Sequence, residues 1–283
     1  MKTKNYYRDF FTKVFKNASF IIPLIIISII FSVGLVMCHF VNKDLFLQVN
    51  LDKAYLLPSW KYPFGTNEFG QNQFYIVFIG AYKTLLLAIV ATFLNLIIGI
   101  IVGILWGTYK TMNSIMFVFK NLIDNTPIVF FYVLIVLFFK DGFWPFLLLV
   151  ILIGWIEFAY LIRNNLIIIK SKDYNKVSYL YKVSLFKIAL NNYLPSILPL
   201  LFNSVALCIP QVISLEITLA YFQFPLGDNN SSLGMLLYSS IANNDCYTYY
   251  YLFLIPLTFL FIINLCIYII SKTISSSFSK EGV

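Results

Sequence analysis

Three acidic residues lie within or beside long apolar stretches of the sequence: Asp124, Glu157 and Glu216. An ionisable group at membrane depth is costly to insert, so each is a candidate proton carrier, ion-pair partner or contact to another chain. Asp124 falls near a predicted membrane interface, and Glu157 can be reached by water or pair with Lys120. For Asp124 and Glu157, a structural ion pair accounts for the acidic residue as well as a role in transport does. Glu216 lies deeper, in a stretch without a basic residue, so we expect it in the bundle interior, in a polar cavity or at another chain. Function, subunit contact and a protonated structural carboxyl all fit that position.

Few other residues suggest catalysis or metal binding. His39, the single histidine, has no second imidazole or cysteine at ligand spacing, so an interfacial hydrogen-bonding role is favoured over a metal ligand. The four cysteines are widely scattered and indicate neither a disulfide framework nor a metal site. The sequence has no phosphate-binding GxxxxGK[ST] loop. We therefore expect a chain that is not an enzyme and binds no cofactor; ATP and magnesium, if they drive it, belong to partner subunits.

Three glycines recur every four residues: Gly99, Gly103 and Gly107. This spacing places them on one face of a helix, where small residues let a neighbouring backbone approach closely. The pattern predicts helix packing, although glycine is also generally common in membrane helices.

The elements that position these residues must lie in lipid. The chain has 283 residues, of which 60% are hydrophobic and 11% charged, which is more apolar surface than a soluble domain of this length can bury. The net charge of +8 is spread between long uncharged stretches and forms no stripe of the kind that binds nucleic acid. We predict an all-α membrane protein, in contact with lipid and crossing the bilayer about six times.

Each predicted span is long enough to cross a hydrocarbon core of ~30 Å at ~1.5 Å per residue. In the third, Lys120 and Asp124 interrupt the apolar pattern at its start, and Pro127 is expected to kink the helix. The six predicted segments are Ser19–Phe40, Thr84–Trp106, Leu122–Phe139, Phe143–Ile162, Pro195–Tyr221 and Tyr251–Ile270.

Basic residues set the predicted orientation, because loops rich in Lys and Arg stay in the cytoplasm. One set of alternate connections, including both ends of the chain, holds fourteen of the 20 Lys and Arg residues, and the other set holds five, with Lys120 unassigned. We therefore place both termini in the cytoplasm. The long polar connection after the first span is then extracellular. The basic connection from Arg163 to Leu194 is cytoplasmic and contains a helix-permissive stretch, Asp173–Leu190, with Asp173 as a possible N-cap.

Several short motifs, in collinear order from Tyr62 to Leu237, resemble the permease subunits of dipeptide, oligopeptide and nickel ABC importers, and the C-type subunit in particular. The first is the Gly-Thr-x-x-x-Gly pattern of Gly65, Thr66 and Gly70. The later ones are Gly80, Ala81, Asp124, Pro127, Gly154, Trp155, Ala159, Arg163, Leu194, Pro195, Leu198, Pro199, Glu216, Leu219, Gly234 and Met235.

The resemblance implies a type I importer fold in a bacterial cell membrane and a division of the chain. Residues 1–18 form a cytoplasmic segment, 19–40 an anchor helix, 41–83 an extracellular connection, 84–272 the core permease domain, and 273–283 a cytoplasmic tail. It also implies a heterodimer with a B-type permease, two cytoplasmic ABC ATPases and an extracellular substrate-binding lipoprotein.

The loop 163–194 is then expected to dock on an ATPase and couple it to the spans. The residues assigned to this coupling are Asp173, Tyr174, Lys176, Val177, Ser178, Tyr181 and Lys182. The sequence departs from the family pattern at Lys176, Val177, Ser178 and Lys182 in this loop, and at Thr218, Gln223 and Pro225 after Glu216.

The predicted function is therefore the permease half of an ATP-driven peptide importer. An ion-coupled secondary carrier that uses Glu216 or Glu157 is the alternative, but no inverted repeat supports it. An intramembrane enzyme ranks last because no nucleophile with a base is evident. Whether the cargo is a dipeptide, a longer peptide or a nickel chelate is left open.

Overall fold

The computed structural model describes residues 14–40, 48–139, 142–170, 188, 193–224 and 232–279. These residues are almost entirely helical, joined by short turns and one irregular polar segment before α4. The helices, in chain order, are α2 (Ala18–Phe40), the 3-10 turn η1 (Leu51–Lys53), α4 (Gln73–Thr108), α5 (Lys110–Asp124), α6 (Ile128–Phe138), α7 (Phe143–Lys170), α10 (Leu194–Tyr221), α11 (Leu233–Ala242), α12 (Asp245–Thr248) and α13 (Tyr251–Ser279).

Five of these helices, α2, α4, α7, α10 and α13, are long and apolar enough to cross a membrane. A sixth crossing is present if α5 and α6 count together as one bent span. The all-α membrane architecture expected from the sequence is therefore confirmed.

The third predicted span, Leu122–Phe139, was wrong in its extent. Helix α5 already begins at Lys110, and the chain turns by 89° between α5 and α6, at the kink expected from Pro127. Proline has no N–H and disfavours a helical conformation in the residue before it. Side chains also donate to the carbonyls at the end of α5: Asn125 Nδ2 donates to Asn121 O at 2.7 Å, and Thr126 Oγ1 donates to Leu122 O at 2.8 Å.

Helix α4 begins at Gln73, well before the predicted start at Thr84. The Asn72 side chain caps it by accepting the Phe74 N–H at 3.1 Å. With 36 residues, α4 exceeds the ~20 needed to cross the hydrocarbon core, so it extends beyond the bilayer and shortens the predicted polar connection.

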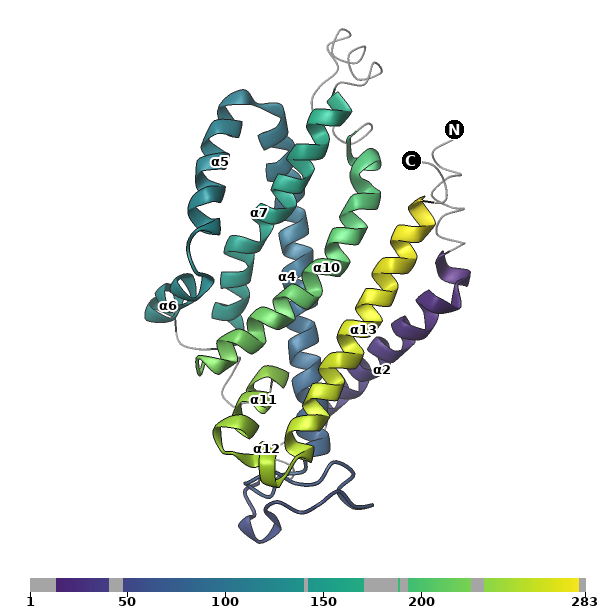
Figure 1. The fold of residues 1–283 in the computed structure, drawn as a ribbon, viewed down its shortest axis with the longest axis vertical. Coiled ribbons are helices and arrows are strands. Elements are labelled where there is room, and N and C mark those ends of the chain that lie inside the picture. Colours follow the sequence, from purple (N-terminus) through teal and green to yellow (C-terminus); the bar gives the residue numbers. More distant parts are fainter. Residues whose placement is uncertain are drawn as a thin grey trace.

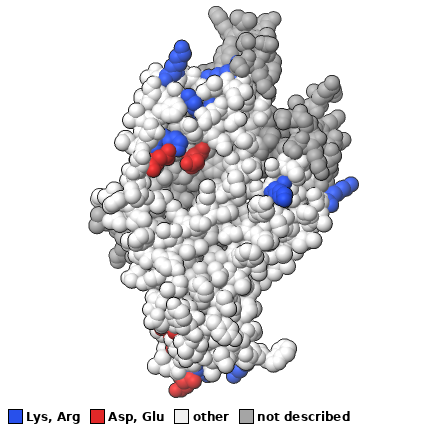
Figure 2. Space-filling model, in the orientation of Figure 1, with Lys and Arg blue, Asp and Glu red and all other residues white. Residues whose placement is uncertain are grey.

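The start of α2 and the end of α13 lie at the same end of the bundle, where α7 ends and α10 begins (Figure 1). This arrangement agrees with an even number of crossings. On the face shown in Figure 2, charged side chains of the described residues lie in the upper half and at the lower tip, with an uncharged band between them. Such a band is what lipid tails require.

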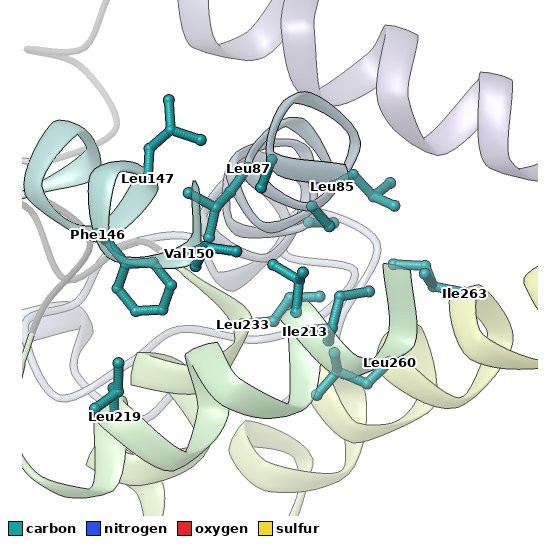
Figure 3. Close-up of a cluster of buried hydrophobic side chains, with 14 of the residues drawn as sticks. Leu85, Leu87, Phe146, Leu147, Val150, Ile213, Leu219, Leu233, Leu260 and Ile263 are labelled. Carbon is teal, nitrogen blue, oxygen red and sulfur yellow. The ribbon is translucent and has the colours of Figure 1, made fainter. Parts of the chain in front are cut away.

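The main core joins the long helices around α4 (Figure 3). Leu85 and Leu87 of α4 contact a cluster contributed by α7, α10, α11 and α13. The labelled members of this cluster are Phe146, Leu147, Val150, Ile213, Leu219, Leu233, Leu260 and Ile263. Helix α11, at ten residues, is too short to cross and packs inside this arrangement from one end.

Helices α4 and α7 meet along the glycine face that the sequence indicated. A Cβ added to Gly103 would lie 2.8 Å from both Ala159 O and Ile162 Cβ. One added to Gly107 would lie 2.9 Å from Leu166 Cδ1, and one added to Gly99 would overlap Phe158. These contacts are closer than carbon atoms normally approach, so only glycine permits this separation of the two helices.

We expect Gly103→Leu to weaken the α4–α7 contact and destabilise the protein by about 1–3 kcal/mol, because an overpacked site forces backbone or rotamer shifts. The measurement is the thermal midpoint of the purified protein in detergent. Ile101→Leu, at an exposed position on the same helix, is the control and should leave the midpoint unchanged. Equal midpoints for both variants would mean that the glycine face is not required.

Candidate functional site

A cavity of about 610 Å³ opens beside α7 and α10, with α4 forming part of its wall. Its lining is mostly apolar but includes polar side chains from all three helices. These are Asn95 of α4, Glu157, Tyr160, Asn164 and Asn165 of α7, and Ser204 and Gln211 of α10. A concave, largely apolar surface with a few polar groups is typical of a site that holds a small organic molecule.

Asn95 is fully buried at the wall of this cavity. Its Nδ2 donates to Val150 O at 3.2 Å, which ties α4 to α7. Gly154 makes the contact possible, because a Cβ there would collide with the Asn95 amide. The carboxamide oxygen, Oδ1, has no hydrogen-bond partner among the described residues.

Glu157 belongs to a small charged cluster near the cavity. Lys120 Nζ lies 2.6 Å from Asp124 Oδ2 and 3.7 Å from Glu157 Oε1, so the pairing suggested by the sequence is present. The Lys120 ammonium also lies 5.0 Å from the centre of the Tyr160 ring, a cation–π contact. Its side chain is only 12% exposed, whereas that of Glu157 is 76% exposed.

The far end of α7 is fixed to α4 and α5. Arg163 Nε donates to Asn113 Oδ1 at 2.9 Å, and its guanidinium lies 4.8 Å from the centre of the Phe117 ring. Lys170 Nζ donates to Gly107 O at 2.6 Å. A cation at the end of a helix donates hydrogen bonds to the last carbonyls, which have no intrahelical partner. It also interacts favourably with the negative end of the helix dipole. The basic connection after Lys170 therefore starts from a firmly held helix end.

Glu216 lies in a different place, at the N-terminus of α11, and is only 2% exposed. Ser232 Oγ donates to its Oε1 at 2.5 Å, and Thr84 Oγ1 donates to its Oε2 at 3.4 Å. The Gly234 backbone N–H also bonds to this carboxyl group. Oxygen acceptors at a helix N-terminus meet free N–H groups and the positive end of the dipole.

Two further hydrogen bonds involve the residues that bind Glu216. Leu233 N donates to Thr84 Oγ1 at 3.3 Å, and Met235 N donates to Ser232 Oγ at 3.2 Å, so Ser232 is the N-cap of α11. Gly80, which belongs to α4, lets the turn at Ser232 approach that helix closely. A Cβ at Gly80 would lie 3.2 Å from Ser232 C. Glu216 thus holds α4, α10 and α11 together.

The polar segment before α4, called the outer segment after its predicted side of the membrane, packs on the beginning of α13. Thr66 is buried: its Oγ1 donates to Lys53 O at 2.6 Å, and its carbonyl accepts Tyr251 Oη at 3.0 Å. Gly65 and Gly70 have φ of +74° and +72°, in the left-handed region that favours glycine. The Gly-Thr-x-x-x-Gly pattern therefore specifies this fold-back.

A second contact ties the outer segment to α12. Tyr55 Oη donates to Asp245 Oδ1 at 3.1 Å, and the Tyr55 ring stacks on Tyr249 at 4.0 Å. Burial, with the Asp245 contact adding to it, raises the pKa of Tyr55 to about 12. Burial also raises the pKa of Asp245, although the Tyr55 hydrogen bond partly opposes this.

The sequence matches the family of binding-protein-dependent transport system inner membrane components over residues 96–280. The chain belongs to this family. It is an inner-membrane transport component and is itself multi-pass, in a bacterial membrane.

Curated relatives extend the match over nearly the whole chain. It is 27% identical over 276 residues to the oligopeptide transport system permease protein AmiD of Streptococcus pneumoniae, covering 96% of this chain and 89% of the relative. It is also 24% identical to the dipeptide permease DppC of Bacillus subtilis, over 82% of this chain and 72% of the relative. The oligopeptide permease OppC of the same organism is 22% identical, over 78% and 72% respectively.

The predicted site residues of this inner-membrane component fall into separate groups. Glu216 lies at the α11 turn, Glu157 lines the cavity, and Asp124 binds Lys120 beside it. The glycines contact α7. The predicted coupling residues, Asp173, Tyr174, Lys176, Val177, Ser178, Tyr181 and Lys182, lie outside the described residues, as does Pro225.

Sequence reasoning missed three residues that matter in the structure: Asn95, Thr84 and Ser232. Ser232 carried a readable signal, since a serine before the apolar run of α11 is a typical N-cap. Asn95 is a lone amide inside a long apolar run, which is an equivalent signal for a buried polar contact. Thr84 carried none, because threonine is unremarkable in a membrane helix.

We expect Glu216→Gln to insert into the membrane but to destabilise the α11 turn by about 1–3 kcal/mol, since an amide directs a donor toward groups that are themselves donors. Thermal unfolding in detergent, together with protease cleavage near Leu233, measures this loss. Thr218→Val is the control on the same helix, because Thr218 is exposed and bonds only to Ser214 O. An unchanged midpoint for Glu216→Gln would show that the carboxylate is merely tolerated.

Proposed function

We propose that this chain is one permease subunit of an ATP-driven importer of peptides, forming half of the translocation pathway. The supporting observation is its similarity, over 96% of its length, to a permease whose name assigns it to oligopeptide transport. Dipeptide permeases are similar over shorter stretches, so peptide is the cargo class that these relatives share. Family membership favours this function over the ion-coupled secondary carrier.

The cavity is the part of the described structure best suited to the pathway. It has an apolar lining with dispersed amide and hydroxyl groups, which suits a peptide, whose backbone needs hydrogen bonds and whose side chains vary. Glu157 on its wall is largely exposed, although it follows the apolar first half of α7, Phe143–Ile156. A charged group at that depth does not face lipid, so we place a second, B-type permease across the cavity to enclose the pathway.

Energy enters from other subunits in this proposal. Two cytoplasmic ABC ATPases bind ATP and magnesium, and an extracellular lipoprotein delivers the peptide. The connection after Lys170 docks on one ATPase, and α7, anchored through Arg163 and Lys170, transmits its movement to the cavity wall. Alternating exposure of the cavity then follows from motion of the two permeases relative to each other.

Ser204→Trp tests the pathway. Ser204 lines the cavity, and among the described residues its hydroxyl bonds only to Leu200 O of its own helix, so an indole there should fill space without removing a tertiary contact. In proteoliposomes of the full complex, we expect peptide uptake to fall at least tenfold while the ATPases still co-purify. Thr258→Trp on α13, at an exposed hydroxyl with a similar local bond, is the control and should transport normally. Normal uptake by Ser204→Trp would exclude this cavity from the pathway.

Replacing Tyr174, Val177 and Tyr181 together with serine tests the coupling loop. Docking into a groove on an ATPase requires apolar contact, whereas attraction to anionic lipid requires only positive charge. We therefore expect the triple variant to insert and pair with its permease partner but to lose ATPase subunits on purification, with hydrolysis uncoupled from uptake. Unchanged recovery and uptake would mean that this loop is held by lipid.

A further inference from the structure

We propose that three aromatic side chains, Tyr132, Phe146 and Phe224, form a seal that closes the outer end of the cavity. In the proposed transport cycle this aromatic seal is the part of the outer gate that this chain supplies, and separation of its rings opens the cavity to the outside. The inference rests on the proposed function and adds the element that controls access to the pathway.

The cavity runs along two helices and ends toward the outer side of the bundle. Its lining extends from Asn165 to Val150 on α7 and from Leu200 to Leu215 on α10. At ~1.5 Å per residue, each lined stretch is about 22 Å long. The end of α7 and the start of α10 lie beside the start of α2 and the end of α13, on the predicted cytoplasmic side (Figure 1). Val150 and Leu215 therefore mark the opposite, outer end of the cavity.

Just beyond that end, each of three helices places a completely buried side chain one turn past a residue of the lining. Residues four positions apart share one face of a helix, so these side chains continue the cavity wall outward. The pairs are Ile128 and Tyr132 on α6, Val150 and Phe146 on α7, and Leu215 and Leu219 on α10. In Figure 3 the Phe146 ring points from α7 toward the helix that carries Leu219. The wall therefore closes at this level.

The rings of the aromatic seal contact one another between these helices. The centre of the Tyr132 ring lies 4.6 Å from that of Phe224 and 5.8 Å from that of Phe146. Both separations are within the range of favourable aromatic pairs. Because Tyr132 and Phe146 are completely buried, no water-filled route passes between these two described side chains. Tyr132 thus joins α6 both to α7 and to the residue that follows α10.

Phe224 reaches Tyr132 because α10 ends in a Schellman motif. Phe224 N donates to Leu219 O at 3.1 Å, and Gln223 N donates to Ala220 O at 2.9 Å, the two hydrogen bonds of that motif. Gln223 has a φ of +62°, in the left-handed region that glycine usually occupies in such caps. Its Nε2 donates to Tyr238 Oη at 2.6 Å, so α11 holds the turn. One of the departures from the family pattern therefore supports the aromatic seal.

Helix α6 is the element of this seal best suited to move. It has only 11 residues, it follows the 89° bend after α5, and its Phe130 and Leu134 side chains are exposed. By contrast, α7 is held against α4 at the glycine face, and α10 is held to α11 through Glu216. A shift of α6 therefore separates Tyr132 from Phe224 and leaves the packing of α4 on α7 intact.

Cys208, whose side chain lines the cavity, is a reporter of access in the test. Membrane vesicles with the complete transporter and no ATP are prepared right-side-out and inside-out. They are treated with methanethiosulfonate ethyltrimethylammonium, a charged thiol reagent that does not cross lipid, and labelling is followed by mass spectrometry of peptides from this chain. We expect Cys208 of the parent to react about tenfold more slowly from the outside, because reactivity of a thiol requires access. Cys246 of α12 is the standard for reagent on the outside.

Two variants each remove one ring of the closest contact. Phe224→Ala should raise the outside rate of Cys208 labelling about tenfold and leave the inside rate unchanged, because reagent then passes the opened seal. Tyr132→Leu removes the other ring and should act in the same direction. Phe222→Ala is the matched control: Phe222 lies at the same helix end but is 54% exposed, so both rates should stay at the parent value.

The inference is overturned if Cys208 of the parent reacts equally fast from both sides, or if Phe224→Ala and Tyr132→Leu leave the outside rate unchanged. It is also overturned if both variants accelerate labelling equally from the two sides, since that pattern reports a loosened fold. Peptide uptake by the parent complex is measured separately. Its failure would refute the proposed function, whereas the side from which Cys208 reacts reports the seal without any uptake.

Discussion

Helix α4 approaches α7 so closely that no side chain fits between their backbones at Gly99, Gly103 and Gly107. In a bilayer, helices gain little from hiding apolar surface from lipid, so close van der Waals contact of this kind provides much of their association. The other features of the site are built on this pair. Asn95 reaches the α7 backbone, Gly154 accommodates it, and Lys170 reaches the end of α4 only because the two helices are held together.

Polar groups inside the bundle fall into two classes. Glu216 has a hydroxyl donor or backbone N–H for each oxygen, and it joins three elements without reaching the cavity. Glu157 is 76% exposed and lines the cavity, whereas Asn95 is completely buried and its carboxamide oxygen has no hydrogen-bond partner among the described residues. Because an unpaired polar group is costly away from water, the hydrogen bonds around Glu216 are explained by stability.

The architecture is also asymmetric in a way that suits a transporter made of two halves. On one side α4 is covered by α2, α7 and α13, and the core is dense around Leu85 and Leu87. On the other side α7 and α10 border an open cavity that carries an exposed carboxylate. The bent α5–α6 segment borders the same cavity through Ile128.

The sequence by itself determined the membrane class, most of the span boundaries and the glycine packing face, because these follow from hydrophobic runs and from residue spacing along one helix. It also indicated the break at Pro127, since proline acts on its own backbone. Its motifs resembled a permease family, and the match over residues 96–280 agrees. The roles of the three acidic residues, however, depended on neighbours far along the chain. Glu216 meets Thr84 and Ser232, and the wall that Glu157 shares with Asn95 is formed by a different helix. Only the tertiary structure decided which carboxylate is fully hydrogen-bonded and which remains open, because that difference is set by which side chains the folded helices bring within bonding distance.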